Sequence, residues 1–265
     1  MKVKVLFDSC VIVAGSVFMS GKDDLDMELK HHFYEEAMRL FSLIKKNLSK
    51  RIGVVTATIE NEALRVLNEA VRGEIRTKYR ELDRKTLFEY SSIALNACDS
   101  RMRKLLSLLQ REPVESDRVA VWFTQVAEMY KELKDMAREL KNLKETASMK
   151  AQAVPKKVRK YENWYKIYLR DERRRHAQLL NLLKKDVEAE DQIILAEACY
   201  LFNLYKQIEG KDVSFFIAST DHHFSPVRKK GWAFESRQVT DEIEKRFGII
   251  CDWPDRIYER VSKLV

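Results

Sequence analysis

The segment VKVLFDSCVIVAG, residues 3–15, consists of two apolar runs separated by Asp8 and Ser9. The first run is rich in valine and leucine, which is typical of a strand buried on both faces of a parallel sheet. An aspartate at the end of such a strand either caps the following helix or belongs to a ligand site at the carboxyl edge of the sheet. If Asp8 belongs to a ligand site, other acidic residues should follow the other strands.

The composition predicts one large, mainly helical domain, or one domain with a substantial insertion. The chain has 265 residues, of which 34% are charged, and it contains only 7 glycines and 4 prolines. Its formal charge of +8 favours an anionic partner, although lysine- and glutamate-rich surfaces can carry such a charge without binding anything.

The cysteine pattern and the hydropathy indicate the cellular compartment in which the protein is expected. The 4 cysteines form no C-x-x-C pair, so we expect reduced core thiols and a cytoplasmic protein. No stretch predicts a membrane span, and Asp8 interrupts the first apolar run too early for a secretory signal. We therefore expect no membrane partner.

Four strands are predicted, at residues 3–8, 51–58, 213–220 and 248–254. Helical periodicity occupies intervals between them, for example from Leu29 to Leu48, and residues 232–234 offer a further short strand. Strands that alternate with helices form parallel βαβ units with right-handed crossovers. We therefore predict an α/β fold in which the carboxyl ends of the strands share one edge.

Residues 75–186 differ in kind from the rest of the chain. Residues 75–185 contain no predicted strand, and apolar residues such as Val119, Val126 and Leu133 recur there at helical spacing. The same residues carry 27 Lys and Arg against 15 Asp and Glu, whereas the remainder of the chain is net acidic. We therefore predict a basic, all-helical insertion at 75–186 that divides one sheet domain into residues 1–74 and 187–265.

The positive charge is concentrated in residues 150–185, which carry 12 Lys and Arg against 3 Asp and Glu, with tyrosine and tryptophan interleaved. Because cations neutralise phosphates and aromatic rings stack on the bases of single strands, this segment predicts nucleic-acid binding. The residues expected to make these contacts are Lys156, Lys157, Arg159, Lys160, Trp164, Tyr165, Arg173, Arg174 and Arg175. The alternative is that the aromatic residues pack on the sheet domain while the cations face an acidic protein partner.

Acidic residues do recur after the predicted strands. Asp221 follows the third strand, and Glu62 and Asp191 lie near the starts of predicted helices. Acids in a first helical turn also complement the helix dipole, so either helix alone is weak support. Clustered carboxylates would raise one another's pKa values unless a divalent cation neutralised them, and Mg²⁺ and Mn²⁺ suit oxygen ligands. We therefore predict a Mg²⁺ or Mn²⁺ site formed by Asp8, Glu62, Asp191 and Asp221.

Four short stretches together resemble the PIN-domain nucleases, a family related in fold to the flap endonucleases. They are LFDSCVIVA at residues 6–14, VVTATIENEAL at 54–64, EDQIILAEA at 190–198 and IASTDHHF at 217–224. The resemblance implies a PIN-like parallel sheet flanked by helices, in which the four acids bind one or two divalent ions. It also implies supporting roles for Ser9 and Thr220. Glu60 remains an alternative to Glu62, and Glu188 or Glu190 could supplement or replace Asp191.

The chemistry that follows from this resemblance is metal-dependent hydrolysis of a phosphodiester, with RNA favoured over DNA by analogy with the family. The alternatives are a PIN-like scaffold that binds nucleic acid or a partner protein without cutting, and an aspartate-dependent phosphatase. Such a phosphatase needs a second aspartate two residues after the first, where this chain has Cys10. His222 and His223, just beyond Asp221, are interpreted as ordinary loop residues.

Overall fold

The computed structural model describes residues 2–21, 27–153, 189–228 and 235–265. Several sequence-based predictions fall outside these ranges, namely the short strand at 232–234, the supporting residue Glu188 and the whole nucleic-acid-binding set. That set comprises Lys156, Lys157, Arg159, Lys160, Trp164, Tyr165, Arg173, Arg174 and Arg175.

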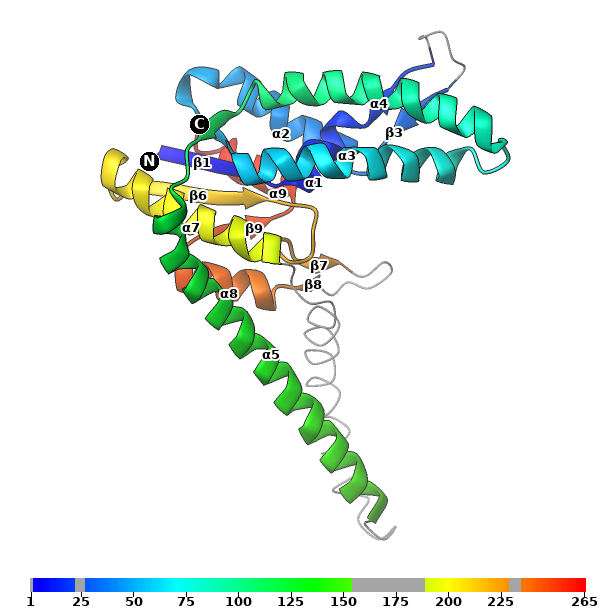
Figure 1. The fold of residues 1–265 in the computed structure, drawn as a ribbon. Coiled ribbons are helices and arrows are strands. Elements are labelled where there is room, and N and C mark those ends of the chain that lie inside the picture. Colours follow the sequence, from blue (N-terminus) through cyan, green and yellow to red (C-terminus); the bar gives the residue numbers. More distant parts are fainter. Residues whose placement is uncertain (1, 22–26, 154–188, 229–234) are drawn as a thin grey trace.

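A parallel sheet forms the centre of the described structure (Figure 1). Its strands are β1 (Lys2–Phe7), β4 (Gly53–Thr56), β5 (Gln110–Glu112), β6 (Val213–Ala218) and β9 (Ile250–Asp252). They lie in the order β5-β4-β1-β6-β9, and every neighbouring pair is parallel. The predicted α/β class and all four predicted strands are therefore confirmed.

Strand β5 shows that one prediction was wrong. The segment 75–185 was expected to contain no strand, yet Gln110–Glu112 pairs with β4 and forms the edge of the sheet. The sequence QRE has neither β-branched nor apolar residues, and only Glu112 is buried. An edge strand of three residues gains its stability from backbone pairing with a neighbour, which leaves little trace in the sequence.

Helices surround the sheet. They are α1 (Ser9–Ser16), α2 (Tyr34–Lys46), α3 (Ala57–Lys78), α4 (Arg84–Leu106), α5 (Ser116–Ala153), α7 (Ala189–Glu209), α8 (Gln238–Phe247) and α9 (Pro254–Val261), with a 3₁₀ turn at Leu48–Lys50. Two short antiparallel ribbons, β2 (Phe18–Met19) with β3 (Leu29–Lys30) and β7 (Val227–Arg228) with β8 (Glu235–Ser236), complete the described elements. Helix α2 begins at Tyr34 rather than Leu29, because Leu29 belongs to β3.

The strands at the centre of the sheet are buried along nearly their whole length, as expected when helices cover both faces. Gly53 in β4 shows how close this packing is, since an added Cβ would lie 2.7 Å from Leu109 Cδ2. The first part of α5 also packs against α7, through buried residues that include Val126 and Met129. Part of the segment predicted as an insertion therefore contributes to the packing around the sheet.

The order of the strands defines a topological switch point. From β1 the chain continues to β4 and β5 on one side, and it then returns to β6 and β9 on the other side. The carboxyl ends of β1 and β6 therefore lie next to each other with a crevice between the connections that leave them, which is where open α/β sheets bind ligands. This edge faces the right-hand side of Figure 1.

Among the described residues, no helix combines the length and the apolar character needed to cross a membrane.

Candidate active site

The register of the sheet brings Asp8 to the switch point. Phe7 at the end of β1 is level with Ala218 at the end of β6, and Asp8 N donates a hydrogen bond to Ala218 O at 3.0 Å. Asp8 and Ser219 therefore leave the sheet side by side. The Ser219 hydroxyl donates a hydrogen bond of 2.6 Å to Asp8 Oδ2.

Asp8 caps helix α1 and also bonds to side chains beyond the cap. Its Oδ1 accepts a hydrogen bond from Ser9 N at 2.7 Å and caps helix α1, while its Oδ2 accepts from Ser219 and from Cys10 Sγ, the latter at 3.1 Å. Burial raises the pKa of Asp8 to about 6, the hydrogen bonds from Ser219 and Cys10 oppose the rise, and the negative charges of Asp221 and Asp191 add to it. Helix capping alone does not explain why Asp221 and Asp191 lie close enough to raise the pKa of Asp8.

Glu62 reaches the same region from helix α3. The side chain of Thr56 caps this helix directly after β4, accepting a hydrogen bond from Ile59 N. Glu62 Oε2 is buried and accepts no hydrogen bond from any residue that the structure describes. Burial and the charge of Asp8 raise the pKa of Glu62 to about 7, against a hydrogen bond from the Ser9 side chain.

The two glutamates that competed with these assignments have cationic partners. Glu60 Oε2 lies 3.1 Å from Arg111 Nε, at the carboxyl end of the edge strand β5. Glu190 on α7 forms an ion pair with Arg65 of α3 at 2.5 Å. Glu62 lies 4.0 Å from the same arginine, at the edge of ion-pair distance.

Asp191 and Asp221 are joined by a histidine that the sequence interpretation had placed among ordinary loop residues. His223 Nδ1 lies 2.9 Å from Asp191 Oδ2, on α7, and 3.2 Å from Asp221 Oδ1, in the loop after β6. His223 is buried, and its backbone N–H also donates to Asp221 Oδ1 at 2.8 Å. The structure thus brings all four predicted acids to one edge of the sheet and adds His223 between two of them.

The supporting hydroxyl groups differ in part from the prediction. Ser9 bonds to Asp8 through its backbone and to Glu62 through its side chain. The hydroxyl that contacts Asp8 from the third strand is that of Ser219, one residue before the predicted Thr220, whose backbone N–H donates to Cys10 Sγ at 3.1 Å. Ser219 Oγ also accepts from Asp221 N at 2.9 Å, so this fully buried serine connects two of the acids.

Two other buried carboxylates near this edge have structural roles. Glu197 of α7 accepts hydrogen bonds from the hydroxyls of Thr56 and Thr58, at 2.6 and 2.5 Å. Asp252 at the end of β9 pairs with Arg237 at 2.9 Å and accepts from Trp253 N. Both groups are satisfied by the protein itself, in contrast to Glu62 Oε2.

Asp8, Glu62, Asp191 and Asp221 supply the carboxylate oxygens that a divalent cation prefers, and ligand atoms of Asp221, His222 and His223 all lie within 4.8 Å of one another. The four carboxylates come from four separate elements, and Asp8 and Glu62 are held in burial that disfavours their charged forms. The nearest arginine, Arg65, is engaged by Glu190. A hard divalent cation would supply the missing positive charge through oxygen ligands alone.

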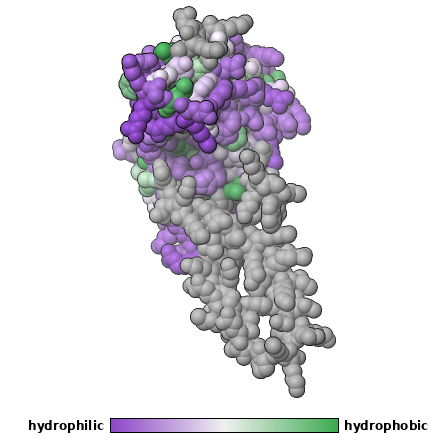
Figure 2. All heavy atoms as spheres, turned by 90° about the vertical axis from the view of Figure 1, so that its right-hand side faces the viewer, coloured by the Kyte–Doolittle hydropathy of each residue, from purple (hydrophilic) through white to green (hydrophobic). Residues whose placement is uncertain are grey.

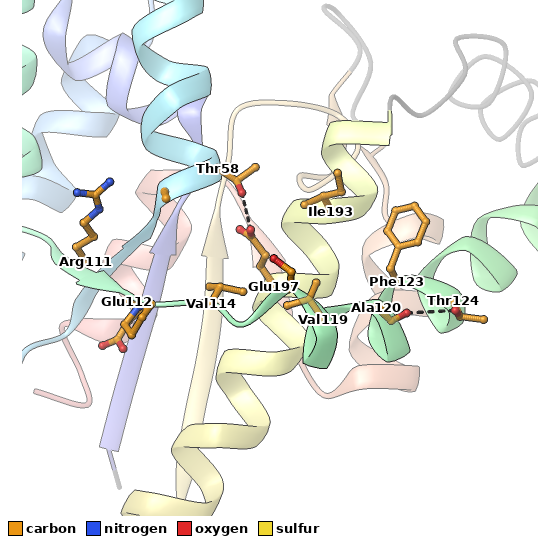
Figure 3. A pocket seen from close by; sticks show the side chains of 13 residues that line it. Thr58, Arg111, Glu112, Val114, Val119, Ala120, Phe123, Thr124, Ile193 and Glu197 are labelled. Carbon is orange, nitrogen blue, oxygen red and sulfur yellow. Dashed lines mark hydrogen bonds between the residues drawn. The ribbon is translucent and has the colours of Figure 1, made fainter.

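A groove of about 1020 Å³ opens between α3, α5, α7 and the segment after β5 (Figure 3), and none of the four acids lines it. Thr58 lies one turn before Glu62 on α3, and Ile193 lies two residues after Asp191 on α7. The half-buried ring of Phe123 and the side chains of Val114 and Val119 give the groove an apolar lining. Figure 2 shows that the described part of the adjoining face is mostly hydrophilic, with small scattered hydrophobic spots.

The four cysteines are all free, as the sequence predicted, and three of them are buried. Cys10 is half-buried, and its thiol lies against Asp8 and Ser219 at the edge of the acid cluster.

Comparison with known proteins adds no assignment to this site: no family model, no curated protein and no solved structure matches the chain.

Proposed function

We propose that this protein is a divalent-metal-dependent nuclease of the PIN type that hydrolyses phosphodiester bonds, with RNA as the favoured substrate. One observation carries the proposal. Asp8, Glu62, Asp191 and Asp221 converge from four elements at the switch point of a parallel sheet, and burial with mutual repulsion raises the pKa values of two of them.

The four carboxylates would hold Mg²⁺ or Mn²⁺, and such an ion, when bound, would supply Lewis-acid chemistry for phosphodiester hydrolysis. Ser219 fixes the rotamer of Asp8 by donating to Oδ2, and it receives the backbone N–H of Asp221. Ser9 donates to Asp8 Oδ1 through its backbone N–H and to Glu62 through its side chain. These bonds position the ligands, so that the site needs little reorganisation when it binds an ion.

The groove between α3, α5 and α7 suits nucleotides that flank the scissile phosphate. Phe123 offers an aromatic face for a base, while the hydroxyls of Thr58 and Thr124 already donate to Glu197 and to Ala120 O. Residues 150–185 supply the cationic surface that a polyanion requires, on grounds of sequence alone. RNA is preferred over DNA by analogy with the PIN family, which the four sequence stretches resemble.

The proposal is tested by incubating labelled single-stranded RNA and DNA with the purified protein and Mn²⁺, Mg²⁺ or a chelator. We expect cleavage with the metals and none with the chelator. Asp8→Asn and Asp221→Asn should each abolish cleavage, while the matched control Asp117→Asn, at an exposed position on α5, should cleave like the wild type.

RNA binding by Asp8→Asn, measured by fluorescence anisotropy, should remain close to that of the wild type, because the basic segment is untouched. Full cleavage by both site variants would refute the proposal. Binding without any metal-dependent cleavage by the wild type would favour the non-cutting scaffold instead.

A further inference from the structure

We propose that His223 is a nitrogen ligand of this metal site and that it makes the site prefer Mn²⁺ over Mg²⁺; this inference rests on the proposed function. The donor set predicted from the sequence consists of carboxylate oxygens alone. The structure places one imidazole nitrogen, His223 Nδ1, within 2.9 Å of Asp191 and 3.2 Å of Asp221.

These separations suit shared coordination. In an octahedral site with bonds of about 2.1 Å, neighbouring ligand atoms lie about 3.0 Å apart. The two contacts of His223 Nδ1, with Asp191 and with Asp221, therefore have the spacing of neighbouring ligands. An ion could take the place of these two ion-pair contacts once Nδ1 carries no proton.

The position of His223 distinguishes it from its neighbour. His222 Nδ1 lies 3.2 Å from Asp221 Oδ1, and its side chain is 36% exposed, whereas the side chain of His223 is 9% exposed. His223 also spans two elements, because Asp191 belongs to α7 and Asp221 to the loop after β6. A buried imidazole held from two sides loses less conformational freedom on binding an ion than an exposed one.

Ligand chemistry then determines the selectivity. Mg²⁺ binds oxygen ligands and retains water in preference to nitrogen, whereas imidazole suits first-row transition ions. Mn²⁺ shares the preference of Mg²⁺ for carboxylate oxygens, but as a first-row transition ion it gains more from one added imidazole than Mg²⁺ does. The four acids therefore set the charge of the site, and His223 shifts its preference between two ions that carry the same charge.

The test compares metal binding by the wild type, His223→Asn, His223→Asp and the matched control His222→Asn. Free Mn²⁺ is followed by electron paramagnetic resonance, with Mg²⁺ as competitor, and pulsed measurements detect ¹⁴N directly bound to Mn²⁺. We expect the ¹⁴N signal in the wild type and in His222→Asn but not in His223→Asn. His223→Asn should also weaken Mn²⁺ binding by at least about tenfold, since even indirect support of a ligand is worth that much.

His223→Asp guards against loss of folding as an explanation. It should bind Mg²⁺ more tightly than the wild type does, and misfolding cannot produce such a gain. A ¹⁴N signal and a Mn²⁺/Mg²⁺ preference that survive in His223→Asn would overturn the inference and leave the nuclease proposal standing. A wild type that binds no Mn²⁺, or binds it equally well after Asp8→Asn, would overturn both.

Discussion

Replacement of Asp8 by asparagine should stabilise the metal-free protein at neutral pH. Asp8 is buried, and its pKa rises from the ordinary value of 3.8 to about 6 in the folded protein. The folded state therefore binds this proton more tightly than the unfolded state. Stability falls as the pH rises from about 4 through 6, and the full penalty applies above that range.

The size of the effect follows from the shift. The rise of about two pKa units lowers the free energy of unfolding of the wild type by about 3 kcal/mol at high pH, and about 1 kcal/mol of this loss is already present at pH 4.5. The free energy of unfolding of Asp8→Asn, relative to that of the wild type, should therefore increase by about 2 kcal/mol between pH 4.5 and pH 8. The hydrogen bond from Ser219, which opposes the rise, is already included in the pKa of about 6.

The assay is urea unfolding followed by far-ultraviolet circular dichroism, in the presence of a chelator, at both pH values. Asp117→Asn, at an exposed position on α5, serves as the matched control and should show no comparable change. Addition of Mn²⁺ at pH 8 should reverse the order, because only the wild type retains the complete ligand set. A stability difference between Asp8→Asn and the wild type that does not vary with pH would refute the conclusion that burial disfavours the charged form of Asp8.

Three further predictions concern neighbouring residues. Glu62→Gln should reduce Mn²⁺-dependent cleavage far more than Glu60→Gln, because Glu60 is paired with Arg111; equal losses in a single-turnover assay would contradict the placement of Glu62 in the metal site. Phe123→Ala should raise KM for single-stranded RNA by about tenfold with little change in kcat, as expected for one lost base stack, while Val121→Ala at an exposed position on the same helix should not. Substitution of Arg173, Arg174 and Arg175 by alanine in an Asp8→Asn background should lower the slope of log affinity against log salt by about 1.4, as for two lost phosphate contacts; an unchanged slope would favour a protein partner for this segment.

The parts of the fold that could be predicted from sequence are those in which local pattern and burial agree. Strands β1 and β6 are long apolar runs, and each is buried almost throughout. Asp8 was recognisable because a carboxylate interrupts such a run. Strand β5 was missed because its three polar residues join the sheet only through backbone pairing with β4.

The candidate site shows a similar division. The four acids could be named from their places after strands and at helix starts, but their partners depend on tertiary contacts between distant segments. Ser219 lies 211 residues from Asp8, and Glu60 meets Arg111 only because β5 pairs beside β4. His223 was interpreted as a loop residue because no sequence spacing relates it to Asp191, which comes from the preceding helix α7.

The most direct test of the central claim is a crystal of the wild type grown with Mn²⁺ and measured at the manganese absorption edge. We predict an anomalous peak for one Mn²⁺ ion that is bound by carboxylate oxygens of Asp8 and Asp221, with Glu62 or Asp191 completing the ligand set. A protein that takes up Mn²⁺ elsewhere, for example at the His31, His32 and Glu74 cluster, and shows no peak between the four acids would contradict it.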